Sequence, residues 1–404
     1  MAAGALWAAL FAVGFIEYTS RASVLVTGLG GLGLLGVWSA RRRFLDDESL
    51  LGRWERLLAT VGNDCVAFAV VNMTGRQIHD LIAVYWSVRP NDTFCTLAVA
   101  LVAVLCWWMP HSLLWHGIEG MLYVALAIAA WTTLVVLRGG GFRGNHLATV
   151  VGSGATPAMI LRGVAVAVVS YVVVDLVVGR WRAVPASTLV LVRPAIIFLT
   201  VMAMGLSYVV VTGAGSFTSN IPFTFAGVAA TYGGHTLQIA CELLYLGLML
   251  ISAIVLVGGV RDRCSPDPSP AGGVDSFRGV ARRGVTVIAV TAVPLGIAEM
   301  FQLGAAVTLV GCFVVTLRAM IRVSREGEPW YEWLPPVVAL AVTSLGLYGL
   351  MNRRLSWDGQ GSMLHLVQTG GVVLIVSVVA YALERRRGRR EGPGAIAFSN
   401  EREV

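Results

Sequence analysis

The chain has 404 residues, of which 56% are hydrophobic and only 13% are charged. Soluble proteins of this length carry about a quarter charged residues, so the composition excludes an ordinary soluble protein. The net charge of +7 comes from arginine, since the chain contains no lysine. We assign these arginines to the ends of membrane helices and expect no nucleic-acid partner.

Repeated apolar runs of roughly 17–25 residues are long enough to cross a hydrocarbon layer, and in lipid such runs must be helical. We therefore predict an all-α, polytopic membrane protein with about 12 transmembrane helices (11–12) in a lipid bilayer. The expected spans are 3–18, 22–39, 57–75, 92–109, 112–137, 157–179, 188–212, 234–259, 284–299, 302–320, 334–351 and 362–384.

Five arginine-rich stretches determine the predicted orientation. With an even number of spans and both termini in the cytoplasm, all five lie on the cytoplasmic side, as the positive-inside rule requires. A tight connection at Glu299-Met300 would then lie on the outer side. The five stretches are 41–56, 180–182, 260–283, 318–325 and 384–390.

One stretch, 260–283, has the Pro, Gly, Ser and Arg content of a cytoplasmic linker. It would separate a membrane domain of about eight helices (1–259) from a four-helix membrane segment (284–384), followed by a polar cytoplasmic tail (385–404).

Residues 76–90 form an amphipathic piece that contains Tyr85 and Trp86. Aromatic residues of this kind gather at membrane surfaces, so we expect the piece to lie along the outer interface.

A possible internal repeat relates 193–211 to 335–351, because Pro, Val and Gly-Leu positions coincide when the two are superposed. The helix after each copy begins with His-x-x-Gln, at His235 and again at His365. Parallel repeats are a known plan of membrane carriers, although coincidence among apolar helices would give the same pattern.

Ionisable groups inside spans cost roughly 2.5–3.5 kcal/mol each at the membrane centre, so each requires an explanation. His235, Gln238 and Glu242 follow i, i+3, i+7 spacing, which places them on one helix face. Such a face should turn toward other helices or a wet cavity. The predicted outer substrate or ion pocket comprises His235, Gln238, Glu242, Glu299, Gln302, His365 and Gln368, with Glu17 at the same level.

The alternative explanation for this outer set is structural: the same side chains can hydrogen-bond between helices or cap helix ends. A second set lies toward the cytoplasm, where Asp64 and Glu119 could form an inner gate or proton relay. Pairing of Asp64 with the nearby Arg56 would explain that carboxylate equally well. His111 and His116 are five residues apart, which does not suit a helical metal pair, and we expect no metal site.

No nucleotide-binding, hydrolase, zinc-protease or haem motif is found, so we expect no cofactor and do not expect an enzyme. Three functions remain open. We favour a secondary carrier, or permease, for an unidentified small solute in the plasma membrane. The first alternative is a non-catalytic protein for membrane assembly, sensing or partner binding. The second is a membrane-embedded enzyme that acts on lipid or lipid-linked substrates.

Overall fold

The computed structural model describes residues 22–42, 49–106, 111–141, 155–180, 221–264, 297–351 and 362–390, with a few isolated positions between them. Every regular element within these ranges is a helix, and none is a strand. The elements are α2 (Ser23–Arg42), α3 (Leu50–Trp86), α4 (Asp92–Cys106), α5 (His111–Arg138), α6 (Pro157–Arg180), α8 (Ile221–Cys264), α10 (Ile297–Glu326), the 3-10 helix η2 (Trp330–Glu332), α11 (Leu334–Met351) and α12 (Ser362–Arg390).

The structure confirms an all-helical, polytopic membrane protein. Five described stretches are long and apolar enough to cross a bilayer, and four shorter apolar helices accompany them. Nine predicted spans coincide with described helices, whereas 3–18, 188–212 and 284–299 lie wholly or mostly outside the described residues. The predicted linker also lies largely outside them, after α8 ends at Cys264.

The predicted tight turn at Glu299-Met300 is wrong, because α10 runs without interruption from Ile297 to Glu326. No Gly, Pro or Asn stands at these positions to favour a turn, so the helix continues through them. The amphipathic piece at 76–90 is not a separate element, because α3 continues through Trp86. Chain direction changes only at Ser87, which has the left-handed conformation with φ 56°.

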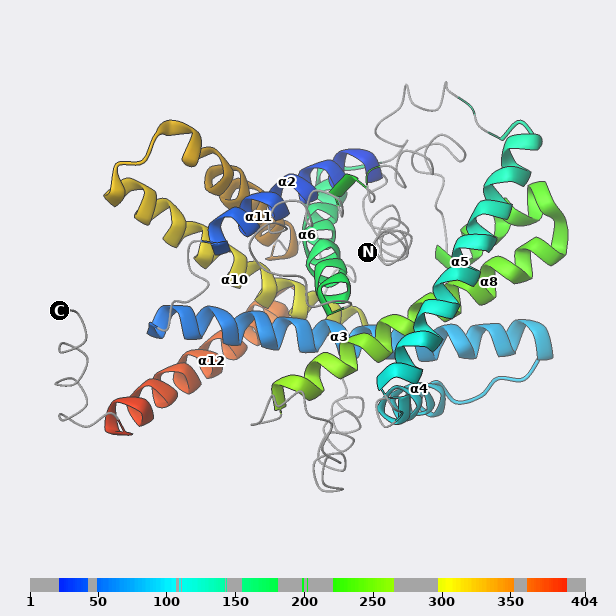
Figure 1. Cartoon of the computed structure of the whole chain (residues 1–404), viewed down its shortest axis with the longest axis horizontal. Helices are drawn as coiled ribbons and strands as arrows, with labels where there is room; N and C mark the ends of the chain where they lie inside the picture. Colours follow the sequence, from blue (N-terminus) through cyan, green and yellow to red (C-terminus); the bar gives the residue numbers. More distant parts are fainter. Residues whose placement is uncertain are drawn as a thin grey trace.

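Helix α3 is the central element, and two groups of helices pack on it (Figure 1). The group we call the α10 bundle consists of α2, α6, α10 and α11, with α12 on its edge. The group we call the α8 bundle consists of α4, α5 and α8. In Figure 1 the α10 bundle lies mainly on the left and the α8 bundle on the right, along the length of α3.

Glycines bring α3 and α10 into close contact. A Cβ atom added to Gly304 would lie 2.9 Å from the Cβ of Cys65 and 2.9 Å from the carbonyl oxygen of Gly62. Farther toward its N-terminus, α3 is joined to α12 by the indole nitrogen of Trp54, which donates to the hydroxyl of Ser377 at 2.6 Å. These contacts fix one half of α3 against the α10 bundle.

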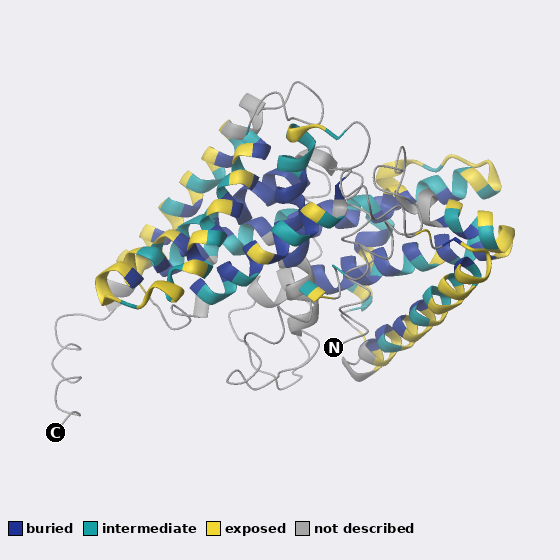
Figure 2. Cartoon of the chain, turned by 90° about the horizontal axis from the view of Figure 1, so that it is seen from above, coloured by how far each residue is buried: buried dark blue, intermediate teal, exposed yellow. Residues whose placement is uncertain are grey.

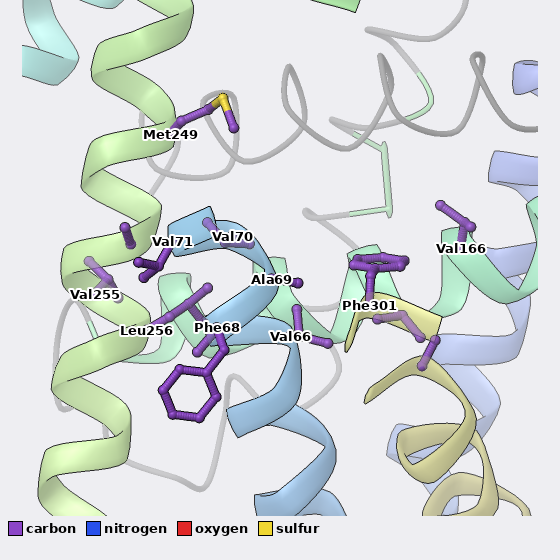
Figure 3. Packing of buried hydrophobic residues seen from close by; sticks show 14 of the residues in the cluster. Val66, Phe68, Ala69, Val70, Val71, Val166, Met249, Val255, Leu256 and Phe301 are labelled. Atoms are coloured by element: carbon purple, nitrogen blue, oxygen red, sulfur yellow. The ribbon is translucent and has the colours of Figure 1, made fainter. Parts of the chain in front are cut away.

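The central core lies where α3 passes between the two bundles. Figure 3 shows Phe68 and Val71 of α3 beside Val255 and Leu256 of α8, with Phe301 of α10 on the other side of α3. Burial falls toward the periphery (Figure 2). The most apolar stretch of α10 is 78% buried, whereas the corresponding stretch of α5 is only 17% buried. Helix α5 therefore presents most of its apolar surface outward, as a lipid-facing helix does.

Helix directions bring several basic stretches to one end of α3. Because Trp54 contacts Ser377, the basic end of α12 extends past the N-terminus of α3. Helices α8 and α10 run antiparallel to α3, so their basic C-terminal ends lie toward the same side. The positive-inside rule therefore predicts that this side is cytoplasmic and that the C-terminal end of α3 is on the outer side.

Candidate functional site

The N-terminal half of α8 is interrupted at Gly234, whose φ is 74° and ψ is −172°. A residue with a side chain adopts this conformation only at a cost, which explains the glycine there. The interruption divides α8 into two helical segments that meet at a kink. His235 begins the second segment, and its side chain is exposed.

From His235, a chain of hydrogen bonds leads into the protein. The imidazole Nδ1 of His235 lies 3.3 Å from the Oε1 of Gln238. The Nε2 of Gln238 donates to the Oε1 of Glu242 at 3.2 Å. On the other carboxylate oxygen, the hydroxyl of Tyr85 donates to Oε2 of Glu242. The chain thus links an exposed imidazole to a carboxyl that is only 1% exposed.

Tyr85 belongs to α3, and its contact with Glu242 joins the C-terminal end of α3 to the segment of α8 that follows the kink. The sequence identified Tyr85 only as an aromatic residue of an interfacial piece. Its role as the partner of Glu242 was missed, because the two residues are 157 positions apart in the chain. One signal pointed to it: a tyrosine at a helix end can supply a hydroxyl donor to a buried acceptor.

Neighbouring contacts surround this chain. On the α5 side, the hydroxyl of Thr132 lies 3.4 Å from the sulfur of Cys241. On the α4 side, the Nδ1 of His79 lies 3.2 Å from a carboxylate oxygen of Asp92. His79 is therefore engaged separately, although it shares the outer part of α3 with Tyr85.

Gln302 and Gln368 lie far from Glu242 along α3. Gly304 contacts Cys65, and with a rise of 1.5 Å per residue Cys65 is about 30 Å from Tyr85. Ser377 contacts Trp54, which is about 46 Å from Tyr85, and Gln368 is only about 14 Å along α12 from Ser377. Neither glutamine therefore reaches the Tyr85–Glu242 contact, although Gln302 is itself buried.

Other residues of the predicted site lie wholly or partly outside the described part of the structure. The backbones of Glu299 and His365 belong to α10 and α12, but their side chains lie outside the described residues, as does Glu17. The inner pair, Asp64 and Glu119, stands on α3 and α5, two helices that share no substantial interface in the described part of the chain. The structure thus brings together His235, Gln238 and Glu242 of the predicted set, and it adds Tyr85.

The chemistry of this group is that of a buried carboxyl held by hydrogen-bond donors. Burial of an ionised carboxylate is costly unless it is compensated, and here each oxygen accepts one hydrogen bond. A metal ion bound to these oxygens would have to displace both donors. No group of three or more potential metal ligands is assembled within the described residues.

Comparisons with known proteins assign no family. No family model matches the chain, and no curated protein resembles it in sequence. Among solved structures, a point mutant of a manganese transporter from Eremococcus coleocola is similar over 95% of both chains, with 11% sequence identity and a TM-score of 0.44. A similarity of this size assigns neither fold nor activity, so the chain is described by its own residues as a polytopic, helical, integral membrane protein.

Proposed function

We propose that the protein is a secondary carrier, a permease of the plasma membrane that moves a small solute, and that Glu242 takes part in its transport cycle. The observation that carries the proposal is the hydrogen-bonded chain from exposed His235 to buried Glu242. Ionisable groups within membrane helices are expensive and mark ion or substrate pathways in transport proteins. A carboxyl that is buried yet linked to the surface suits a group that gains and loses a ligand during a cycle.

The kink in α8 supports the same proposal. Many carriers bind their substrates where a transmembrane helix is interrupted, because the freed ends of the two segments offer unpaired backbone groups. Here the interruption at Gly234 stands only one residue before His235. The polar chain and the interruption therefore occupy the same part of α8, at the predicted outer side.

Uptake by reconstituted vesicles tests the proposal. Purified full-length protein is placed in vesicles that contain a pH-sensitive dye, and a panel of amino acids, sugars, organic cations and inorganic cations is added outside. We expect solute-dependent flux from the parent protein and at least a tenfold loss for Glu242→Gln, since each lost interaction worth 1.4 kcal/mol changes a rate or equilibrium about tenfold. Flux that is equal in the parent and in Glu242→Gln would remove Glu242 from the cycle.

A second candidate is a non-transporting protein for membrane assembly or partner binding. One observation favours it: both oxygens of Glu242 are hydrogen-bonded and the residue is almost completely buried, as expected for polar groups that only hold helices together. This function predicts no flux with any member of the panel. It also predicts that Glu242→Gln lowers stability without changing any transport rate.

A further inference from the structure

The amide of Gln238 lies between two titratable groups and contacts each through a different atom. Its Nε2 donates to Glu242, and its Oε1 faces the Nδ1 of His235. A glutamine amide has a donor end and an acceptor end, so it cannot donate to both neighbours or accept from both through these two atoms. The direction of one hydrogen bond therefore fixes the direction of the other.

In the arrangement described, Glu242 accepts from Gln238 and so presents an unprotonated oxygen to it. Oε1 of Gln238 can only accept, so the Nδ1 of His235 must carry a proton to complete the contact. This requirement holds for the charged imidazole and for the neutral tautomer with hydrogen on Nδ1.

Protonation of Glu242 on the oxygen that faces Gln238 reverses both bonds. The new O–H needs an acceptor, which Gln238 supplies if its amide turns by 180°. The Nε2 of Gln238 then points at His235 and requires an unprotonated Nδ1 there. On the other oxygen, the hydroxyl of Tyr85 donates to Glu242, so a proton placed on that oxygen would compete with this hydrogen bond.

We propose that Gln238 makes protonation of Glu242 on this oxygen and protonation of Nδ1 of His235 mutually exclusive. When Glu242 gains a proton from solvent, a neutral His235 keeps its single N–H proton on Nε2, and a charged His235 releases its Nδ1 proton to solvent. This inference rests on the proposed function for its biological use: it names the proton as the ligand of Glu242 and His235 as the group that reports its arrival at the surface. The physical coupling itself depends only on the three side chains and their hydrogen bonds.

Other titratable groups on the helices near this part of α8 make no contact with Gln238 in the described part of the chain. From α3, Tyr85 faces Glu242 itself. From α4, Asp92 contacts His79. From α5, Thr132 faces the thiol of Cys241, and Arg138 is exposed at the helix end. Gln238 is thus the side chain that connects His235 to Glu242 in the described structure.

The test reads the tautomer of His235 by nuclear magnetic resonance of the full-length protein labelled with ¹⁵N-histidine, at a pH where the imidazole is neutral. In the parent we expect hydrogen on Nδ1. In Glu242→Gln, the new amide oxygen accepts from Tyr85 and its NH2 donates to Gln238, which imitates the protonated carboxyl. We therefore expect the proton of His235 to move to Nε2, with the Nδ1 resonance shifting to the unprotonated region.

Removal of the connecting amide supplies the control. In a Gln238→Leu background, Glu242→Gln should leave the tautomer of His235 unchanged, although loss of the negative charge still acts on the imidazole through space. His79, which contacts Asp80 and Asp92, should keep its resonances in every variant and so reports that the fold is intact. A His235→Gln variant identifies the resonance of His235.

Two results would overturn the proposal: a tautomer that is the same in the parent and in Glu242→Gln, or a change that persists after Gln238→Leu. Because the readout requires no solute, it separates this inference from the carrier function. If the vesicles show no flux but the tautomer changes, the carrier function is rejected and the coupling through Gln238 is kept. If flux depends on Glu242 but the tautomer does not change, the coupling is rejected and the carrier function is kept.

Discussion

The two ends of α3 are held by different kinds of contact. Toward its N-terminus, Gly62 lets α10 approach until backbone nearly touches backbone, and Trp54 adds one hydrogen bond to α12. Toward its C-terminus, the contacts with α8 and α4 include polar side chains, among them Tyr85 with Glu242 and His79 with Asp92. Close packing has one geometry, whereas hydrogen-bonded side chains can change partners when they gain or lose a proton. The C-terminal end also has a close approach, since a Cβ atom on Gly75 would lie 2.6 Å from the Cα of Thr96 in α4, but its polar contacts give it a part that can respond to protonation.

Gly304→Leu should have the largest effect, because it disrupts the close approach of α10 to α3. The first side-chain atom would lie 2.9 Å from atoms of both Gly62 and Cys65, so α3 and α10 must separate. We expect a loss of about 3 kcal/mol in the free energy of unfolding. Thermal unfolding in detergent, followed by circular dichroism, measures it. Gly370→Leu is the control, since its Cβ would meet no atom within 4 Å; equal loss in both variants would contradict the close contact.

Tyr85→Phe should rank second, since it removes one donor from a buried carboxylate. An unsatisfied buried acceptor costs about 1–3 kcal/mol, and we expect a loss near the middle of that range. The same unfolding measurement applies. Tyr123→Phe is the matched control, because Tyr123 is 68% exposed. If the two variants were equally stable, the contact between Tyr85 and Glu242 would contribute nothing.

Ser377→Ala should cost less, about 1 kcal/mol, since it removes one neutral hydrogen bond between α12 and α3. Ser252→Ala is the control, because the hydroxyl of Ser252 donates to the carbonyl of Leu248 within its own helix. A loss of stability in Ser377→Ala that exceeds the loss in Ser252→Ala would locate the effect. Equal stability of the two variants would contradict the predicted joint between α12 and α3.

Asp92→Asn should have the smallest effect, at most about 0.5 kcal/mol, because Asp92 is 61% exposed and solvent screens its interaction with His79. Because dissolved ions screen an exposed charge pair, added salt should reduce the difference from the parent. A loss that is independent of salt would show that Asp92 acts by packing and not by charge.

The sequence predicted the helices better than their ends. Hydropathy located the apolar part of α3 but ended it before Arg76, since charge and not backbone conformation ends an apolar run. The helix continues through Gly75 and Arg76, because no Pro interrupts it before Ser87. At Glu299 the opposite error occurred, and one long helix was divided because its polar residue resembled a turn.

The candidate site was predictable only along one helix. Spacing placed His235, Gln238 and Glu242 on one face, and the structure shows them hydrogen-bonded in that order. The contact of Tyr85 with Glu242, and the separation of Gln368 from Glu242, depend on which helices are neighbours. No local sequence pattern encodes that. The two His-x-x-Gln motifs look equivalent in sequence, yet the helices that carry them pack on different parts of α3.

The length of α3 has an electrical consequence. Its 37 residues extend about 55 Å, whereas a bilayer with its headgroups is about 40–45 Å thick, so a helix that begins at the inner surface and stands upright overshoots the outer one. With the predicted orientation, and whether α3 leans or protrudes, we expect Tyr85 in its last turn to reach the outer headgroups, and Glu242 with it. A proton that arrives there has crossed almost none of the transmembrane field. Its binding should follow the pH of the outer solution and be nearly indifferent to membrane voltage.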